Sequence, residues 1–378
     1  MTLIYLIAGE ASGDILGGRL MSALRAARPD LAFAGIGGPA MQALGLNSLF
    51  AMNELALMGL AEILPKILRL HVLIRQTIED IAARKPDMVV TIDSPGFCLR
   101  ILDALRGSPI RRVHYVAPQV WAWRENRVKS YPGLWDELLC LLPFEPAFFA
   151  RHGIQARFVG HPVLESGADR GDAARFAAQF NMPASALPLL VMPGSRRSEL
   201  ARLMPVFGET IHMLHETLPA LVPILAAAPN IADEATAMAQ TWPVTPLIVS
   251  APATRYDAFA AARAALTKSG TSTLELALAG VPMIVAYKVN PLTALMARRL
   301  IKVPYASIVN LLSNAPILPE FIQQDCNAPA LARSLMTLLD GGPAAQTQKA
   351  AMKTVLDSLQ APQGSPSQAA AASILALL

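Results

Sequence analysis

Short apolar stretches rich in β-branched residues alternate along this chain with longer amphipathic stretches. In the first half, the apolar stretches predict strands at residues 3–8, 88–92, 112–116, 138–142 and 157–159. After a turn-rich segment, the alternation begins again and predicts strands at residues 189–192, 222–226, 247–249, 264–267 and 283–286. Strands that alternate with helices form parallel sheets covered by helices. The pattern therefore predicts an α/β protein with two doubly wound halves.

The length of the chain agrees with two domains. It has 378 residues, too many for one core of ordinary size. We expect a first domain at residues 1–165, a second at 166–340, and a helical tail at 341–378. The tail ends in an apolar segment, which would be costly to expose, so we expect it to dock on the first domain or on a partner subunit. Two domains also imply a cleft between them.

Hydropathy argues against a membrane span but leaves open a membrane surface. The chain is 53% hydrophobic, yet we find no stretch of about 18 apolar residues free of charge. The segment at 54–74 ("ELALMGLAEILPKILRLHVLI") is interrupted by Glu62, Pro65, Lys66 and Arg69. It suits either a helix pair lying in a membrane interface or a core helix. The first apolar run has no basic region before it, which predicts a first strand and a cytoplasmic protein.

Charge and metal-binding residue types add little chemistry. The net charge is +4, and the cations form only short clusters, which could attract anionic lipid, phosphate or nucleic acid, or merely be solvated. Cys98, Cys140 and Cys326 are widely spaced among apolar neighbours, so we expect buried packing residues. His212 and His215 form the one close histidine pair, and we predict no metal site.

Two turns of the first half carry candidate chemistry, because ligands collect at the carboxyl ends of strands in doubly wound sheets. In "AGEASGD" (8–14), two glycines permit close backbone approach, and Ser12 or Asp14 can cap the following helix. In "TIDSPGF" (91–97), Asp93 leaves a fully apolar strand. It could accept a proton from a hydroxyl group, or it could be the N-cap of the next helix.

Two turns of the second half favour phosphate. "MPGSRRSE" (192–199) joins a Gly-Ser turn to two arginines, whose forks match phosphate oxygens. "KSGTSTLE" (268–275) offers hydroxyl and N–H groups at a helix start, followed by Glu275, which could accept bonds from a ribose diol. Together they suggest a nucleotide diphosphate, although the chain has no G-x-x-x-x-G-K-[ST] loop.

These motifs, taken in order, resemble those of lipid-A-disaccharide synthase, an inverting glycosyltransferase family of the GT-B type. The resemblance implies two Rossmann-like domains that face each other across a cleft. The matching segments run from residue 8 to residue 323: "AGEASGD", "GIGGPAMQALG", "LALMGLAEILP", "TIDSPGF", "HYVAPQVWAWRENRVK", "LLPFEPAFFARHG", "FVGHPVLE", "MPGSRRSEL", "KSGTSTLELAL", "PMIVAYK" with "PLT", "VPYASIVNLL" and "LPEFIQ".

The resemblance implies a reaction and roles for particular residues. The family joins UDP-2,3-diacylglucosamine to 2,3-diacylglucosamine 1-phosphate, makes the β-1,6-linked disaccharide of lipid A and releases UDP. Asp93 would be the general base for the acceptor 6-hydroxyl, with Glu10, Ser12 and Gly13 on the acceptor side. The implied nucleotide or diphosphate contacts are Arg196, Ser269, Gly270, Thr271, Glu275, Asn310, Glu320 and Gln323. Whether Arg196 or Arg197 meets the diphosphate stays open.

The resemblance also implies a place in the cell and a set of partners. The enzyme would act at the cytoplasmic face of the inner membrane, bound peripherally to an anionic surface, without a metal, another cofactor or nucleic acid. A homodimer stays open. We expect an exposed apolar patch flanked by Lys66, Arg69 and Arg75. Its predicted members are Leu55, Leu57, Met58, Leu60, Ile63 and Leu64.

Two other functions fit parts of the sequence. Another UDP-sugar enzyme, such as a glycosyltransferase with a different lipid acceptor or a UDP-N-acetylglucosamine epimerase, would keep the nucleotide turns. A binding protein that senses a nucleotide without turnover would keep them too, but it would not need Asp93. UDP release that depends on a diacylated acceptor would separate these three functions.

Overall fold

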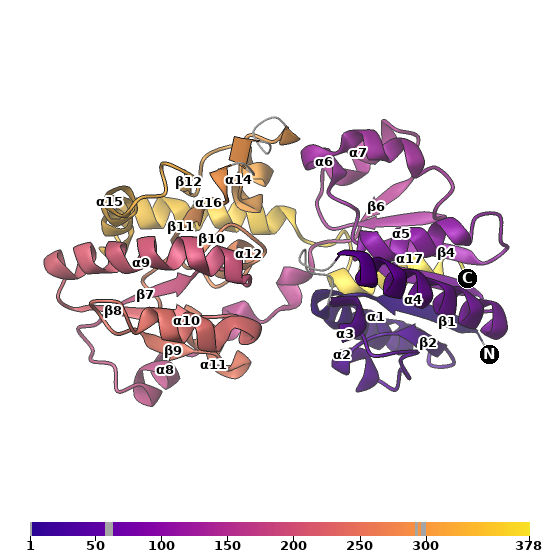
Figure 1. The fold of residues 1–378 in the computed structure, drawn as a ribbon, viewed down its shortest axis with the longest axis horizontal. Helices are drawn as coiled ribbons and strands as arrows, with labels where there is room; N and C mark the ends of the chain where they lie inside the picture. Colours follow the sequence, from indigo (N-terminus) through magenta and orange to yellow (C-terminus); the bar gives the residue numbers. More distant parts are fainter. Residues whose placement is uncertain (1, 57–62, 292–293, 296–299) are drawn as a thin grey trace. The chain divides into compact units, whose positions relative to one another are not determined.

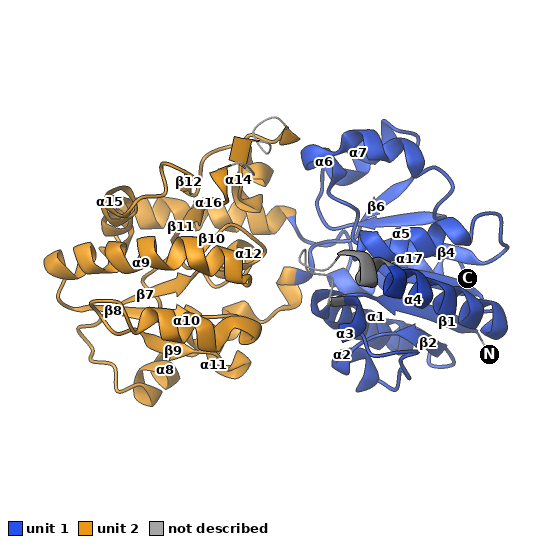
Figure 2. Ribbon diagram, viewed as in Figure 1, with its two compact units in different colours: residues 1–162, 359–378 blue, residues 163–358 orange. Residues whose placement is uncertain are grey.

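The chain folds into two compact units, each described here by itself (Figure 2). The computed structural model describes residues 2–56, 63–291, 294–295 and 300–378, with the side chains of residues 56 and 63–67 outside that description. Unit 1 comprises Met1–Pro162 and Leu359–Leu378, and unit 2 comprises Val163–Ser358. Each unit contains a six-stranded sheet. The two predicted doubly wound α/β halves are therefore confirmed.

The sheet of unit 1 is parallel and has the strand order β2-β1-β3-β4-β5-β6. Its strands are β1 (Leu3–Ala8), β2 (Ala32–Ile36), β3 (Met88–Ile92), β4 (Arg111–Tyr115), β5 (Glu137–Cys140) and β6 (Ala156–Phe158). Its helices are α1 (Ala11–Ala27), α2 (Pro39–Gln42), α3 (Asn53–Ala56), α4 (Ile63–Arg84), α5 (Pro95–Ala104), α6 (Val120–Trp123), α7 (Glu145–Ala150) and α17 (Pro366–Leu375), with the 3-10 turn η1 (Glu125–Ser130).

Helices cover both faces of this sheet (Figure 1). Alternate residues of β1 point to opposite faces, so Ile4 and Leu6 join one apolar cluster while Tyr5 and Ile7 join another. The first cluster includes buried side chains of α1 and α17, and the second includes those of α4 and α5. Burial on both faces explains why the strands of a parallel sheet read as continuous apolar runs.

The sheet of unit 2 is also parallel and has the order β12-β11-β10-β7-β8-β9. Its strands are β7 (Leu187–Met192), β8 (Leu221–Ala226), β9 (Leu247–Val249), β10 (Ala264–Lys268), β11 (Met283–Tyr287) and β12 (Glu320–Ile322). Its helices are α8 (Ala173–Gln179), α9 (Arg197–Thr217), α10 (Ala232–Ala239), α11 (Pro252–Ala261), α12 (Ser272–Leu278), α14 (Ile308–Ser313), α15 (Ala328–Leu339) and α16 (Pro343–Ser358). The 3-10 turns are η2 (Pro162–Glu165), η3 (Ala168–Arg170) and η4 (Pro229–Ile231).

The segment predicted as a tail is shared between the units. In unit 2, the Gln348 side chain on α16 accepts a hydrogen bond from Met283 N (2.6 Å) and donates one to Met283 O (3.0 Å). In unit 1, α17 packs against α1, and His161 N donates to Leu359 O at 2.9 Å. No helix within the described ranges is both long and apolar enough to cross a membrane.

Candidate functional site

The turn after β3 brings Asp93 to the carboxyl edge of the unit 1 sheet. The Asp93 N–H donates to Tyr115 O at 2.9 Å, which ties the turn to the neighbouring strand β4. Asp93 (φ 52°), Ser94 (φ 45°) and Val116 (φ 79°) all have left-handed backbone conformations, which are costly for residues other than glycine. The N-cap position of α5 belongs to Ser94, so the alternative interpretation of Asp93 as the N-cap does not hold.

The surroundings of Asp93 raise the pKa of its carboxyl group. Burial is the main cause, and the charge of Glu10 raises the pKa further, against a lowering by the Ser94 N–H group. Glu10 is exposed and follows β1, whose Ala8 is paired in register with Ile92 of β3. The two turns therefore place two carboxylates at the same edge of the sheet.

The turn after β1 packs closely against the turn after β3. A Cβ atom at Gly9 would collide with the side chain of Ser94, so glycine is needed for this approach. Gly13 is buried on α1, where an added Cβ atom would lie 3.4 Å from Ile92 O. Ser12 is exposed. Glu10, Gly13 and Asp93 thus belong to one local arrangement.

Asp14 has a different role from the predicted one. Its carboxylate accepts hydrogen bonds from Gly38 N (2.8 Å), Ala40 N (2.9 Å) and Met41 N (3.1 Å). It therefore caps the start of α2, and the expectation that it caps its own helix is wrong. The N-cap of α1 is Glu10, which makes no side-chain cap bond.

A buried carboxylate at Glu145 was not predicted from the sequence. Its oxygens accept hydrogen bonds from Leu141 N (3.1 Å), Leu142 N (3.0 Å) and Trp121 Nε1 (3.1 Å). Burial nevertheless raises its pKa to about 7, against the lowering effect of these donors. The Trp121 bond fixes α6 to α7, and beyond it Trp123 is exposed with the Arg124 guanidinium 3.8 Å from its ring centroid. A glutamate among apolar residues in "LLPFEPAFF" was the available signal.

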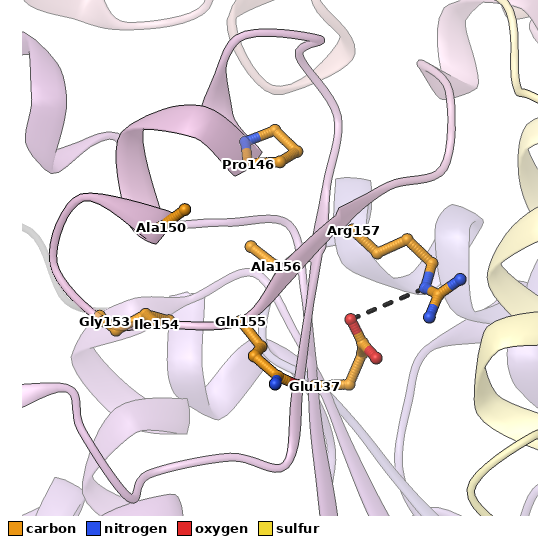
Figure 3. Close-up of a pocket in the computed structure, with 8 residues that line it drawn as sticks. All are labelled: Glu137, Pro146, Ala150, Gly153, Ile154, Gln155, Ala156 and Arg157. Atoms are coloured by element: carbon orange, nitrogen blue, oxygen red, sulfur yellow. Dashed lines mark ion pairs between the residues drawn. The ribbon is translucent and has the colours of Figure 1, made fainter.

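Figure 3 shows a hollow of about 500 Å³ in unit 1. Because Glu137 begins β5, the hollow lies at the amino edge of the sheet, whereas Asp93 follows the end of β3 at the carboxyl edge. It is lined partly by Glu137, the first residue of β5, and by the chain that leads into β6. The Glu137 carboxylate lies 3.8 Å from Arg157 Nε. None of the predicted site residues lines this hollow, so we place the candidate chemistry at the other edge.

Most of the segment predicted to face a membrane falls outside the described residues. Leu57, Met58 and Leu60 lie in that part, and so do the side chains of Ile63, Leu64 and Lys66. Leu55 is buried in the core, so the expectation that it is exposed is wrong. The described part of α4 exposes Leu68 (67%) and Val72 (39%).

In unit 2, the turn after β7 leads into α9. The carboxylate of Glu199 accepts hydrogen bonds from Ser195 N (3.0 Å) and Arg196 N (3.3 Å). Both arginine side chains are exposed, but Arg197 lies 3.0 Å from Glu234, whereas Arg196 is 4.0 Å from Glu199. Arg196 is therefore less closely ion-paired than Arg197.

The turn after β10 lies beside it, because β10 and β7 are neighbouring strands. Gly270 and Thr271 belong to this turn, and Thr271 is exposed. Ser269 Oγ donates to Ala306 O at 2.7 Å. One turn later on α12, the Glu275 carboxylate accepts from Arg255 Nη2 (2.6 Å) and from Tyr256 Oη (3.2 Å).

The side chains of three further predicted residues form hydrogen bonds with groups of unit 2: Asn310, Glu320 and Gln323. Glu320 accepts from Ala306 N and Ser307 N, both at 2.8 Å, and from Asn310 Nδ2 at 2.8 Å. Gln323 accepts from Val289 N at 2.7 Å. Ala306 bonds to both Ser269 and Glu320, and Glu320 bonds to Asn310, so these residues form one hydrogen-bonded group. Gln323 instead bonds to the chain at Val289.

Within the described ranges, we find no group of three or more His, Cys, Asp or Glu side chains that could hold a metal ion. The Cys98, Cys140 and Cys326 thiols are buried and unbridged.

Comparisons with known proteins agree in sequence and in fold. The profile of the family described as lipid-A-disaccharide synthetase matches residues 4–374. A lipid-A-disaccharide synthase from Granulibacter bethesdensis is 54% identical over 387 residues, covering 100% of this chain and 98% of the relative. One from Pseudomonas aeruginosa (strain LESB58) is 42% identical, covering 90% of each chain.

Solved structures share the fold at low sequence identity. The UDP-GlcNAc 2-epimerase from Neisseria meningitidis bound to UDP-GlcNAc has a TM-score of 0.65 at 12% identity, covering 95% of this chain and 99% of that one. The calicheamicin glycosyltransferase CalG4 has a TM-score of 0.60 at 16% identity, covering 100% of this chain and 98% of that one. The GT-B fold expected from the sequence is confirmed.

Proposed function

Because this chain belongs to the lipid-A-disaccharide synthase family, we propose that unit 1 supplies the catalytic base and the acceptor site, and that unit 2 holds the UDP moiety of the donor. The enzyme transfers diacylglucosamine from UDP-2,3-diacylglucosamine to 2,3-diacylglucosamine 1-phosphate, with inversion and release of UDP. The match over residues 4–374 carries this conclusion, since it spans both units.

The proposed base is Asp93, which removes the proton of the acceptor 6-hydroxyl as that oxygen attacks the donor sugar. Its position at the carboxyl edge of a parallel sheet supports this role. Its raised pKa also supports the role, because a general base works best when its pKa approaches the working pH. Glu10, Ser12 and Gly13 would line the acceptor side.

The proposed UDP site uses the turns after β7 and β10. Arg196 would meet the diphosphate, since Arg197 is paired with Glu234 at 3.0 Å. The turn formed by Ser269, Gly270 and Thr271 would add N–H and hydroxyl donors. Glu275 would accept bonds from the ribose, with its orientation held by Arg255. Asn310, Glu320 and Gln323 would shape the loops around the nucleotide through their bonds to backbone groups.

Turnover and UDP affinity, measured on the same variants, test the catalytic base and the UDP site separately. Asp93→Asn should lower kcat by about 10² to 10⁴ while calorimetry shows UDP affinity unchanged. Arg196→Ala and Glu275→Ala should each weaken UDP binding by about 1.5 to 3 kcal/mol, the usual contribution of a hydrogen bond to a charged group. The matched control is Asp103→Asn, which changes an exposed carboxylate on α5 and should leave both turnover and UDP affinity like those of the parent. Turnover of Asp93→Asn within a few fold of the parent would remove Asp93 from the proposed role.

We also propose that the enzyme binds peripherally to the cytoplasmic face of the inner membrane, where both acylated substrates reside. Leu68 and Val72 support this proposal as exposed apolar residues one turn apart on α4. The exposed Trp123 ring and the neighbouring Arg124 guanidinium form a pair of groups suited to contact with lipid headgroups.

Analytical ultracentrifugation of the purified enzyme tests whether it forms a homodimer.

A further inference from the structure

An ion pair joins the two turns that we assign to the UDP diphosphate. Lys268 Nζ lies 3.1 Å from Glu199 Oε1, with 21% of the lysine side chain and 10% of the glutamate side chain exposed. Lys268 is the last residue of β10, and Glu199 lies in the first turn of α9. Since Thr267 of β10 is paired in register with Met192 of β7, the ion pair bridges two neighbouring strand ends.

The second oxygen of Glu199 is bound to the turn after β7. Its Oε2 atom accepts hydrogen bonds from Ser195 N and Arg196 N. The turn makes room for this carboxylate at Gly194, whose φ is 116° and where a Cβ atom would collide with Oε2. Glu199 therefore belongs to the turn, and Lys268 connects it to the next one.

The charge of Glu199 would oppose the binding of a diphosphate if it stood alone. Helix starts attract anions, but here a carboxylate lies beside the N–H groups that would meet one. A buried unpaired charge is also costly. The ammonium group of Lys268 removes both penalties, and the Tyr287 ring, with its centroid 5.6 Å from Nζ, helps to hold it in place.

We propose that Lys268 is a positioning residue for diphosphate binding: it cancels the charge of Glu199 and fastens the turn after β10 to the turn after β7. The inference rests on the proposed placement of UDP in unit 2. It adds a specific expectation, namely that loss of Lys268 harms the binding of the diphosphate and leaves the binding of the nucleoside unchanged.

The test compares UDP with uridine, which lacks the diphosphate. Lys268→Met should weaken UDP binding about tenfold or more by calorimetry, because Glu199 then keeps, among the described residues, only Arg196, 4.0 Å away, as a cationic partner near the phosphates. Uridine affinity, measured by NMR titration, should stay within about twofold of the parent. The double variant Lys268→Met/Glu199→Gln should recover UDP affinity to within about threefold, since it removes the repelling charge as well. Lys268→Arg keeps the cation and should keep UDP affinity.

Lys353→Met is the matched control. It removes a lysine from an exposed ion pair with Asp357 (3.1 Å) on α16, and it should bind UDP like the parent. The inference is overturned if Lys268→Met binds UDP normally, if UDP and uridine weaken together, or if the double variant shows no recovery. If the parent itself does not bind UDP, the placement of UDP in unit 2 fails instead. If Glu275→Ala weakens UDP and Lys268→Met does not, only the role of Lys268 fails.

Discussion

Asp93, the proposed base, has a pKa that a neighbouring carboxylate, Glu10, helps to raise. The charge of Glu10 is the second cause of the raised pKa of Asp93, after burial. A base must be deprotonated to act, so kcat/KM should fall as the pH drops through this raised pKa. The acid limb of the pH profile therefore reports the environment that the two turns create.

We predict that Glu10→Gln moves this acid limb to lower pH. Removal of a neighbouring negative charge lowers the pKa of Asp93, so the base stays ionised in more acidic buffer. The measurement is kcat/KM against pH for the parent and the variant. Glu79→Gln removes an equal charge from the exposed pair with Arg75 on α4 and should leave the limb in place. A limb that moves equally in both variants, or in neither, would contradict this coupling.

Sequence patterns placed some candidate site residues and missed the contacts of others for a physical reason. Asp93 could be placed because a carboxylate directly after an apolar strand must emerge at the carboxyl edge of the sheet. The partners of Asp14 and Glu199 could not be predicted. These carboxylates bind N–H groups and a cation that only the folded chain brings close to them. Motif spacing records which residues are present, and tertiary contacts decide what each carboxylate binds.

At the scale of elements, Glu145 joins α6, α7 and the end of β5 through three N–H donors. Burial raises its pKa from the ordinary 4.5 to about 7. Between these values the folded chain keeps a proton that the unfolded chain has lost. The free energy of unfolding that Glu145 contributes is therefore fully present below the unfolded pKa and falls as the pH rises through the folded one.

We predict that this group lowers the free energy of unfolding by about 3 kcal/mol between pH 5 and pH 8, since each unit of pKa shift corresponds to about 1.4 kcal/mol. Urea unfolding of the parent and of Glu145→Gln at both values measures it, because the neutral variant lacks this part of the pH dependence. Glu209→Gln, exposed on α9, should keep the dependence of the parent. Identical pH slopes for the parent and Glu145→Gln would rule out the effect.

The exposed face of α4 carries a separate prediction about membrane binding. Leu68→Ser with Val72→Ser should reduce sedimentation with vesicles that contain phosphatidylglycerol, because it removes apolar surface from a helix that also displays Arg75. Both residues are exposed, so the fold and UDP affinity should persist. Met336→Ser, which changes an exposed residue of α15 in unit 2, is the control. Equal sedimentation of all three proteins would place lipid contact elsewhere.

Elements with long apolar or periodic patterns were predictable, and short ones were not. The strands β1 and β7 are continuous apolar runs, and β3 is interrupted only by Thr91; the sequence located each of them within one or two residues. The strand β2 ("AFAGI") has small residues and a glycine, and β12 has three residues of which one is charged. Their strand conformation comes from pairing with β1 and β11 and has little local signal.

For the whole molecule, unit 1 depends on residues from both ends of the chain. The buried side chains Ala370, Ala371 and Ile374 of α17 join the same cluster as Leu16 and Leu20 of α1. Alternation of strands and helices predicted two halves, and the apolar end of the tail favoured docking on the first domain or on a partner subunit. Neither pattern indicated that the tail divides, with α16 in unit 2 and α17 in unit 1. Such an assignment depends on which apolar faces match, a property of the folded state.

We predict that Ile374→Ala destabilises unit 1 by about 2 to 5 kcal/mol, because it leaves a cavity at a fully buried position. Hydrogen exchange resolved by peptide should show faster exchange in unit 1 than in unit 2, and UDP affinity should be retained. Leu378→Ala, at a residue that is 40% exposed, should change little. Equal loss of protection in both units would mean that their stabilities are not separable in this way.

The return of the chain to unit 1 has a consequence for the order in which the protein folds during synthesis. The ribosome completes α1 and the six strands of the first sheet before it starts unit 2, yet α17 emerges only after unit 2 has been made. Throughout that interval the apolar side chains of α1 that α17 will cover remain open to water or to a chaperone. Unit 2 is one continuous segment, Val163–Ser358, so all of it is synthesised before the last helix of unit 1.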